Sequence, residues 1–557
     1  MIFFQKYKKI ILLICILLLT FFLYSPVLNA DFVWDDKIFF FEQDTYTQGV
    51  WSWEAVSRSV LPHASYFRPL VFSTYIYEIK FFGLNPTIFH ITNLLIHLAN
   101  IILAYHLARI LLAKINITYS SYKALLIALV YAIHPTQIET VAWIAGRFDL
   151  LAAFFSFISL ILFIQYKNNK AFITLGLFTW FCALLSKDSA VLILPIVFFL
   201  FSALDDNKNW LISVKHTILE NKFLLLGMIS VFLIYYVLRV EALPHALIVN
   251  NQLNYLLDYK PLNRVILVLY LITEYTLHAI FPFFNIGPIH PFDQNTIHTT
   301  KWYIYPFISI IMLLAVVYGL YNKNKFSIFF TLFFICLSLV IQIIPIFSGG
   351  TIQDRFLYFP LFFLLISLAT LNYNLVKLQE KFFKYTIICL WLILSIWSLF
   401  VTVPLWKNNL TLWGWQYIKF PESYAREHYF KELLSLNRLD ILEKEFSKIM
   451  KSKKYKEQGF ELSTQLFYGT YLIQKHDSEA IPYLRGVLVA YPTNKFGLPI
   501  YKDTQMNRSF IEVNVQLAQA YFLIKDDKKQ AIAILKIVQK VDPNHPNVRE
   551  LEKMLTE

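Results

Sequence analysis

The sequence predicts an all-α fold, in which a polytopic bundle of membrane helices precedes a soluble α-helical domain. The chain of 557 residues is 57% hydrophobic and 16% charged, far more apolar than a soluble globular protein of this length. Twelve apolar runs are long enough to be membrane-helix candidates. After residue 404 the composition becomes soluble and a self-similar pattern begins. We therefore expect a membrane domain over residues 1–403 and a helical repeat domain over residues 404–557.

The loops that connect the apolar runs are predicted to alternate between the two sides of the membrane, with one exception. They span residues 10–28, 88–113, 119–134, 148–166, 171–185, 189–204, 223–240, 264–282, 302–320, 326–346, 356–372 and 383–403. The basic clusters expected in the cytoplasm are Lys114, Lys167 with Lys170, Lys208 with Lys215, Lys323 with Lys325, and Lys377 with Lys381 and Lys384. The first run follows basic residues and lacks a small-residue cleavage site, which predicts a retained helix with a cytoplasmic N-terminus.

The exception lies between Lys208 and Lys325. Because both are expected in the cytoplasm, an even number of crossings must separate them. Three candidate runs lie between them, so one of the three must not cross the membrane. We expect residues 264–282 to be re-entrant or interfacial, since this run contains Glu274 and His278 and ends in a proline-rich segment that cannot continue a helix. Eleven crossings then place the C-terminal domain outside the cytoplasm.

The formal net charge of +13 does not by itself indicate a nucleic-acid partner. The basic residues lie in short loops between apolar runs and in the C-terminal tail, where positive-inside topology explains them. The four cysteines fall inside apolar runs without metal-ligand spacing, as is typical of small core residues. We therefore expect membrane lipid, and no nucleic acid, among the partners.

The C-terminal part carries two similar units, "SEAIPYLRGVLVAYP" and "KQAIAILKIVQKVDP". The spacings of nine and twelve residues join Tyr471, Ala480 and Pro492, and again Phe522, Ala531 and Pro543. This spacing matches tetratricopeptide helix pairs, in which the alanine lets two helices approach closely and the proline ends the second. The units are 51 residues apart, so we expect an insertion between them, and a degenerate pair at about residues 424–450.

Charged residues that are costly at membrane depth gather in loops predicted to be extracytoplasmic. They are Asp31, Asp35, Asp36 and Arg68 in the first loop (about residues 29–87), His134, Glu139, Arg147 and Asp149 in the second, Lys187 and Asp188 in the third, and Asp354 and Arg355 in a late one. A carboxylate can accept the proton of an incoming hydroxyl, and cations can hold the phosphate of a lipid-linked leaving group. The pattern suits Asp35 or Asp36 as base and Arg147, Lys187 and Arg355 as phosphate ligands.

The second apolar run begins with a polar face in "FHITNLLIHLAN". His90, Asn93, His97 and Asn100 recur at helical spacing, so they share one side of a helix. Two histidines a heptad apart could bind metal, but interhelical hydrogen bonding in a bundle is the commoner explanation. The one metal site that the sequence suggests is a divalent ion held with substrate by Asp35 or Asp36.

Several stretches occur in the order seen in a known family. They are "NADFVWDD", "SYFRPL", "FHITNLLIHLAN", "HPTQIETVAWIAGRFDLLA", "LLSKDSAV" and "QDRFLYFPLFFLL". In these stretches the chain resembles the TMTC-type membrane proteins with tetratricopeptide repeats, a family similar to the protein O-mannosyltransferases among the GT-C glycosyltransferases. The resemblance covers residues 20 to about 370, and the fourth stretch is its most specific element.

The resemblance implies an inverting GT-C glycosyltransferase. Such an enzyme transfers a sugar, mannose among the candidates, from an undecaprenyl- or dolichyl-phosphate donor to a protein Ser/Thr or a glycan outside the cytoplasm. Pattern and resemblance together give Asp35, Asp36 and Glu139 as catalytic residues, and Arg68, His134, Arg147, Asp149, Lys187, Asp188, Arg355 and Tyr358 as donor-binding residues. The repeat domain would bind the acceptor.

Two departures from the family bear on this interpretation. The family often has Lys-Glu where this chain has Lys187 and Asp188, which retains a carboxylate, and its animal members carry longer repeat arrays. A short array offers less surface for a protein substrate and favours the plasma or inner membrane of a prokaryote. Two alternatives stay open, namely a non-catalytic membrane-anchored repeat scaffold of the cell envelope and, less well supported, a transporter.

Overall fold

The computed structural model describes residues 2–41, 49–58, 66–166, 169–207, 209–243, 261–290, 292, 299–343, 352–371, 378–491, 493, 499 and 504–541. Five residues of the predicted patterns, Lys167, Lys208, Lys377, Pro492 and Pro543, lie outside the described residues. The chain divides into two compact units, residues 1–408 and 409–557, and each is described by itself.

The first unit is a bundle of helices, and each of the twelve predicted apolar runs overlaps one of them, although α16 ends at Leu337, before the predicted end at residue 346. They are α1 (Ile2–Tyr24), α6 (Pro86–Lys114), α7 (Ser120–Ala132), α9 (Arg147–Gln165), α10 (Ala171–Leu184), α11 (Ile193–Ala203), α13 (Lys222–Ala242), α14 (Pro261–Ile280), α15 (Thr300–Tyr321), α16 (Lys325–Leu337), α17 (Pro360–Ala369) and α18 (Leu378–Thr402). The predicted all-α membrane fold is therefore confirmed.

Among the described residues, six segments are long and apolar enough to cross a membrane, and five shorter apolar helices accompany them. The long ones are Tyr7–Asn29, Pro86–Lys114, Ile144–Gln165, Lys222–Ala242, Thr300–Tyr321 and Tyr385–Lys407. The chain is thus an integral membrane protein. The count of eleven crossings stays a prediction, as does the re-entrant or interfacial position of α14, which forms one continuous helix up to Ile280.

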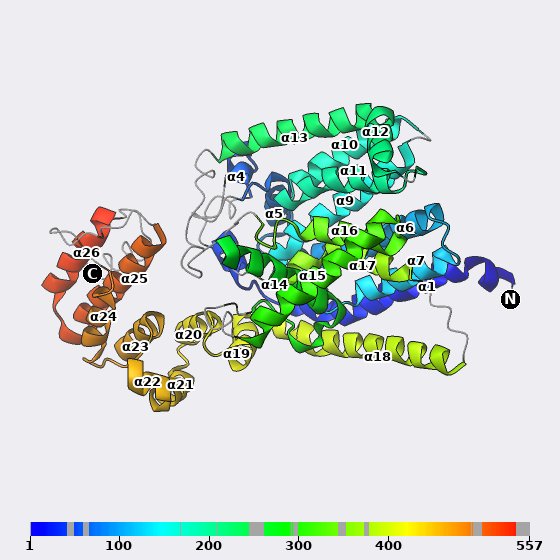
Figure 1. The fold of residues 1–557 in the computed structure, drawn as a ribbon. Helices are drawn as coiled ribbons and strands as arrows, with labels where there is room; N and C mark the ends of the chain where they lie inside the picture. The colour runs from blue at the N-terminus through cyan, green and yellow to red at the C-terminus, as the bar shows by residue number, and fades with distance from the viewer. Residues whose placement is uncertain are drawn as a thin grey trace. The chain divides into compact units, whose positions relative to one another are not determined.

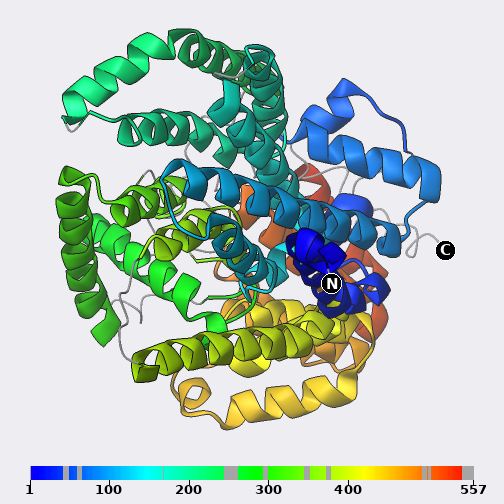
Figure 2. The ribbon, with the colours of Figure 1, turned by 90° about the vertical axis from the view of Figure 1, so that its right-hand side faces the viewer.

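The helices at the centre of the bundle are more deeply buried than those at its periphery. The span Ile144–Gln165, which contains α9, is 61% buried, whereas the spans of α13 and α15 are 17% buried. Figures 1 and 2 show α13 and α18 on opposite sides of the unit, with α6, α9 and α17 between them. The exposed faces of the outer helices carry large apolar side chains such as Phe223, Leu233 and Trp397, which suits contact with lipid.

The polar face of α6 is buried and bonds to neighbouring segments, as predicted. Asn93 Nδ2 donates to the carbonyl oxygens of Trp143 and Ile144, and Asn100 Nδ2 donates to that of Leu150. His97 Nδ1 lies 2.8 Å from the hydroxyl of Tyr358. The prediction of interhelical hydrogen bonding is confirmed for Asn93, His97 and Asn100, which hold α6 against α9 and the start of α17.

Three of the loops predicted to be cytoplasmic meet at one end of the bundle. Lys325 Nζ donates to the carbonyl oxygen of Ile115 at 2.5 Å, and Lys323 Nζ donates to that of Asp205 at 3.0 Å. Three loops separated by up to two hundred residues therefore share one end, as the alternation of basic clusters requires.

Short helices fill the loops at the other end. They are η1 (Ser25–Asn29), α2 (Asp35–Phe41), α4 (Trp53–Ser57), α5 (Pro69–Phe82), α8 (Gln137–Ala142), η2 (Ile144–Gly146), η4 (Asp188–Leu192), η6 (Pro282–Phe284), η8 (Asp354–Leu357) and η9 (Val403–Lys407), while α12 (Trp210–Glu220) precedes α13. Most of the predicted site residues belong to these elements or their flanks.

The second unit consists of helices in its described part. They are α19 (Asn409–Lys419), α20 (Ala425–Ser435), α21 (Leu439–Lys451), α22 (Lys453–Gln458), α23 (Leu462–Gln474), α24 (Ala480–Leu488), α25 (Thr504–Lys525) and α26 (Lys528–Val541). Ala480 and Ala531 are fully buried, and a Cβ at Gly469 would lie 2.8 Å from the side chain of Leu484. Small residues thus let paired helices approach closely, although assignment to the tetratricopeptide class stays a prediction.

Candidate active site

Four of the predicted residues come together as two ion pairs beside a small cavity. The Arg355 guanidinium pairs with Glu139, whose Oε2 also accepts the backbone N–H of Arg355 at 3.0 Å. Lys187 Nζ lies 2.6 Å from Asp149 Oδ1. A cavity of about 60 Å³ is lined by Asp149, Lys187 and Arg355 on its polar side. Residues far apart in the sequence therefore form one charged site.

Close backbone packing brings the second loop into this site. A Cβ at Gly146 would lie 2.1 Å from the carbonyl oxygen of Thr140, so any other residue there would push η2 away from α8. This contact folds the loop back on itself between Glu139 on α8 and Asp149 on α9. The glycine explains how one short segment supplies both acids.

A strained turn in the first loop brings Asp35 to the charged site. Trp34 has a φ of 55°, which is unusual for a bulky residue and marks a constrained backbone. Its ring stacks on that of Trp143, with centroids 4.6 Å apart, and the Arg355 guanidinium lies over both rings, 5.4 and 5.1 Å from their centroids. The stack fixes the start of α2, where Asp35 lies, beside Arg355.

Asp35 has the electrostatics of a base. Its side chain is half-buried, and burial raises the pKa of its carboxyl to about 6, while the charges of Arg355 and Arg68 act in the opposite direction. Partial desolvation makes a carboxylate a stronger base, and the nearby cations keep it ionised at neutral pH.

Asp36 has a structural position instead. It is fully buried, its Oδ2 accepts the backbone N–H of Val33 at 3.1 Å, and its Oδ1 accepts that of Ala145 at 3.0 Å. Burial raises the pKa of Asp36, which these two hydrogen bonds oppose. Oδ2 thus binds within the first loop and Oδ1 joins that loop to the second, which gives Asp36 a structural position, while its predicted roles as base and divalent-ion ligand stay predictions.

Arg147 is also placed differently from the prediction. Its side chain is 0% exposed, and each guanidinium nitrogen donates a hydrogen bond. The acceptors are Asn93 Oδ1, Thr74 Oγ1, Glu78 Oε2 and the carbonyl oxygen of Phe89. Arg147 therefore anchors α9 to α5 and α6 inside the bundle, and its predicted contact with phosphate stays a prediction.

His134 and Tyr358 likewise serve packing. His134 is fully buried, with Nε2 2.9 Å from the carbonyl oxygen of Ala279 and Nδ1 2.8 Å from Thr136 Oγ1, and burial lowers its pKa to about 3. The hydroxyl of Tyr358 is occupied by His97 and Asn100 on α6. Neither side chain lines the cavity, so the structure does not bring them to the predicted donor site.

Arg68 and Asp188 flank the site on two sides. The Arg68 guanidinium lies 4.1 Å from the ring centroids of both Tyr66 and Phe148, and its Nε is buried without a hydrogen-bond partner among the described residues. Asp188 instead accepts from Arg239 Nε at 3.0 Å and binds the hydroxyl of Tyr235, both on α13. The Nε–H group of Arg68 is thus available to donate a hydrogen bond, whereas Asp188 connects η4 to α13.

Most of the remaining lining of the cavity is apolar. Ile193, Val340, Phe356 and Phe359 belong to it, and the centroid of the Phe356 ring lies 5.3 Å from Lys187 Nζ. Burial lowers the pKa of Lys187, and the carboxylate of Asp149 opposes that shift. The cavity therefore combines two cations with an apolar surface.

Sequence reasoning missed Trp34, Trp143 and Glu78. The tryptophans appeared as apolar neighbours of the acids, and nothing local indicated that they stack. Glu78 lies on α5 in an apolar stretch of the first loop, where its isolated charge was the available signal for a buried partner.

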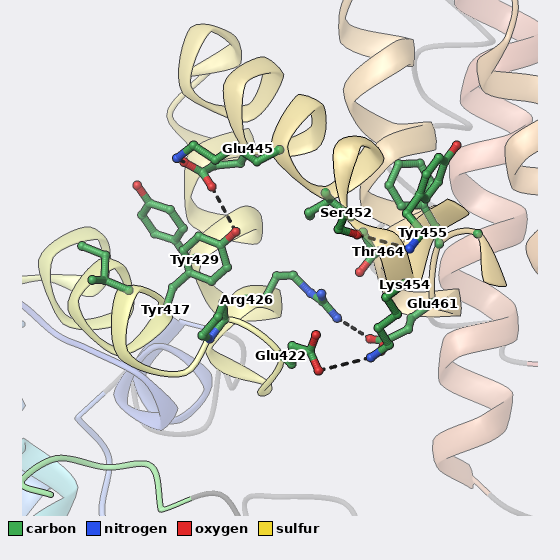
Figure 3. A pocket seen from close by; sticks show the side chains of 16 residues that line it. Tyr417, Glu422, Arg426, Tyr429, Glu445, Ser452, Lys454, Tyr455, Glu461 and Thr464 are labelled. Carbon is green, nitrogen blue, oxygen red and sulfur yellow. Dashed lines mark hydrogen bonds and ion pairs between the residues drawn. The ribbon is translucent and has the colours of Figure 1, made fainter. Parts of the chain in front are cut away.

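A second, larger cavity lies in the helical unit and is shown in Figure 3. Its volume is about 520 Å³, and residues from α19 to α23 line it. Glu461 pairs with Arg426 and, at 2.7 Å, with Lys454, while the Tyr417 hydroxyl donates to Glu445 at 3.0 Å. Aromatic rings and paired charges thus share its walls.

Comparison with known proteins confirms the resemblance to the TMTC-type proteins. Protein O-mannosyl-transferase TMTC2 of Homo sapiens is 29% identical over 190 residues, which cover 31% of this chain and 22% of the relative. Protein O-mannosyl-transferase TMTC4 of Mus musculus is 29% identical over 194 residues, covering 30% and 26%. For protein O-mannosyl-transferase F38B6.6 of Caenorhabditis elegans the identity is 27% over 205 residues, covering 34% and 28%.

The matches therefore span about a quarter of the length of these relatives. No protein-family model matches the chain. Among solved structures, the archaeal oligosaccharyltransferase AglB from Archaeoglobus fulgidus, in complex with an inhibitory peptide and a dolichol-phosphate, aligns with 76% of this chain and 60% of that chain, at 15% identity and a TM-score of 0.40.

Proposed function

We propose that this protein is a membrane glycosyltransferase that moves a sugar from a polyprenyl-phosphate donor to an acceptor hydroxyl. The observation that carries the proposal is the half-buried carboxylate of Asp35 beside the cations Arg68 and Arg355, next to a cavity that also contains Lys187. The relatives named protein O-mannosyl-transferases support the same reaction class, with mannose as the first sugar to test and protein Ser/Thr as the first acceptor.

The residues divide the chemistry between a base and an anion site. The acceptor oxygen attacks the anomeric carbon, and the bond from that carbon to the phosphate oxygen breaks with inversion. Asp35 takes the hydroxyl proton and later releases it to water. The leaving lipid phosphate gains negative charge, which Lys187, Arg68 and the planar guanidinium of Arg355 stabilise.

Glu139 and Asp149 act as positioning residues in this scheme. Glu139 receives two hydrogen bonds from Arg355, one from the side chain and one from the backbone, and so sets the direction of the guanidinium. Asp149 orients the Lys187 ammonium at 2.6 Å. With each cation held before the donor arrives, less of the binding free energy is lost to ordering side chains.

We also propose that the helical unit holds the acceptor. Its cavity of about 520 Å³ falls within the size range of ligand sites, roughly 300–1,000 Å³. The tyrosines and the charged pairs of its walls suit a peptide with polar and aromatic groups (Figure 3). We further propose that the N-terminus lies in the cytoplasm, that both the site and this unit lie outside it, and that the membrane is the plasma or inner membrane of a prokaryote.

Replacing Lys187 with methionine should weaken donor binding. A hydrogen bond to a charged group contributes about 1.5–3 kcal/mol, so KM for a synthetic polyprenyl-phosphate sugar should rise roughly 10- to 100-fold. The measurement is the initial rate of purified full-length protein against donor concentration. Lys215→Met on the exposed face of α12 is the matched control and should leave KM unchanged. Equal KM values in both variants would contradict the phosphate assignment.

The rate of transfer should rise with pH through about 6. The base must be ionised, and burial raises the pKa of Asp35 to about 6, so protonation disables the enzyme below that pH. On the acid side kcat/KM should fall about tenfold per pH unit. A profile measured with a short-chain donor tests this, and a kcat/KM independent of pH across this range would contradict Asp35 as base.

A further inference from the structure

Three metal-ligating side chains converge next to the proposed site but take no part in its chemistry. His278 is near the end of α14, His290 follows η6, and Asp354 begins η8. His278 Nε2 lies 2.6 Å and His290 Nε2 lies 2.7 Å from the same oxygen, Asp354 Oδ1. The side chains are 6%, 3% and 0% exposed. Three ligand atoms from three separate segments thus surround one buried point.

A second layer of hydrogen bonds orients these groups. The backbone N–H of Gly287 donates to Asp354 Oδ2 at 3.0 Å, which directs Oδ1 toward the imidazoles. The Asn285 amide lies 2.7 Å from His290 Nδ1. The side-chain oxygen of the same amide, Asn285 Oδ1, is buried without a hydrogen-bond partner among the described residues. In the flipped orientation of the Asn285 amide, this oxygen accepts a hydrogen bond from Nδ1–H of His290. The lone pair on Nε2 of His290 is then free to bind a metal ion.

We propose that His278, His290 and Asp354 bind one divalent transition-metal ion, with Zn²⁺ as the best fit. Two imidazoles and one carboxylate are typical ligands of zinc, whereas Mg²⁺ and Ca²⁺ prefer all-oxygen sets. At zinc–ligand distances of about 2.0–2.1 Å the ligand atoms would stand about 3.3 Å apart in a tetrahedron. The two contacts with Asp354 therefore need to open by roughly half an ångström, and the metal replaces the two N–H···O hydrogen bonds.

The metal would connect three segments, namely α14, the residues that follow η6, and η8. Asp354 directly precedes Arg355, and Ala279, next to His278, accepts the hydrogen bond of His134. Binding would therefore fix the start of η8 and, with it, the guanidinium of Arg355. The positioning effect on Arg355 rests on the proposed function, but metal binding itself does not.

Metal retention by the intact protein tests the site. Full-length protein, purified in detergent with any affinity tag removed, is treated with a chelator, loaded with Zn²⁺ and passed through a desalting column. Elemental analysis should find about one zinc per chain, since the site offers one set of three ligands. His290→Ala and the nearly isosteric Asp354→Asn should each lose that zinc. His216→Ala is the matched control, because His216 also lies between two carboxylates, those of Asp205 and Glu220, but is exposed.

A spectroscopic measurement keeps the test independent of variant folding. Wild-type protein loaded with Co²⁺ should show the visible absorption of a four-coordinate ion, and Zn²⁺ should displace it. Zinc contents equal in wild type and His290→Ala, together with a Co²⁺ spectrum like that of the aqueous ion, would overturn the proposal. No donor is present in either measurement, so a failure here leaves the glycosyltransferase proposal standing, and inactivity with intact metal binding counts against that proposal alone.

Discussion

Replacing Asp35 with asparagine should lower kcat for sugar transfer about 10²- to 10⁴-fold, the usual contribution of a general base. The asparagine keeps the size of the side chain and its place beside Arg355 but cannot accept the hydroxyl proton. Donor binding and folding should change little, because Asp35 is half-buried at the start of α2. The measurement is single-turnover transfer from a synthetic polyprenyl-phosphate sugar by purified protein, with the melting temperature recorded in parallel.

Two neighbouring aspartates supply the controls for this variant. Asp31 is exposed, with its Oδ1 near its neighbour's backbone N–H, so Asp31→Asn should transfer sugar at the wild-type rate. Asp36→Asn should mainly lower thermal stability, because an amide offers one oxygen where two backbone N–H groups now bind the carboxylate. Wild-type turnover by Asp35→Asn would contradict the base assignment, whereas an absence of transfer by the wild-type protein itself would favour the non-catalytic scaffold that the sequence leaves open.

The second large effect concerns stability: Arg147→Met should lower the free energy of unfolding by about 3–5 kcal/mol, as when one partner of a buried ion pair is removed. Glu78 would keep a buried charge whose partner lies 2.7 Å away in the wild type, and Asn93, Thr74 and the Phe89 carbonyl would lose their donor. Thermal unfolding in detergent measures the change.

Arg109 on α6 is a suitable control, because it is an exposed arginine on a neighbouring helix. Arg109→Met should change the free energy of unfolding by less than about 0.5 kcal/mol. Combining Arg147→Met with Glu78→Gln should recover part of the loss, since the second change removes the uncompensated charge. An Arg147→Met protein that melts like the wild type but binds donor poorly would instead restore the predicted phosphate contact.

The four-residue stretch "GRFD" shows why neighbouring charged residues take different roles. Arg147 and Asp149 are two positions apart at the start of α9, so they face different sides of the helix. Arg147 turns into the bundle toward Glu78, and Asp149 turns toward Lys187 at the cavity. A motif thus identifies the segment that carries the site without telling which of its charges reaches the substrate.

The sequence by itself determined the helices, their approximate ends and the set of loops that supply the site. Those properties depend on local hydrophobicity, proline placement and the cost of charges at membrane depth, all of which can be read along the chain. The polar face of α6 was predictable for the same reason, because helical spacing alone aligns Asn93, His97 and Asn100.

Only the tertiary structure decided which charges are anchors and which remain available. Asp36 and Arg147 bind groups 109 and 69 positions away, and the convergence of His278, His290 and Asp354 joins segments up to 76 positions apart. Whether a buried charge is compensated depends on such distant partners, and no local pattern records them. For the same reason the roles of Asp35 and Asp36 could be distinguished only in the folded structure. There Asp35 is half-buried beside the tryptophan stack and two arginines.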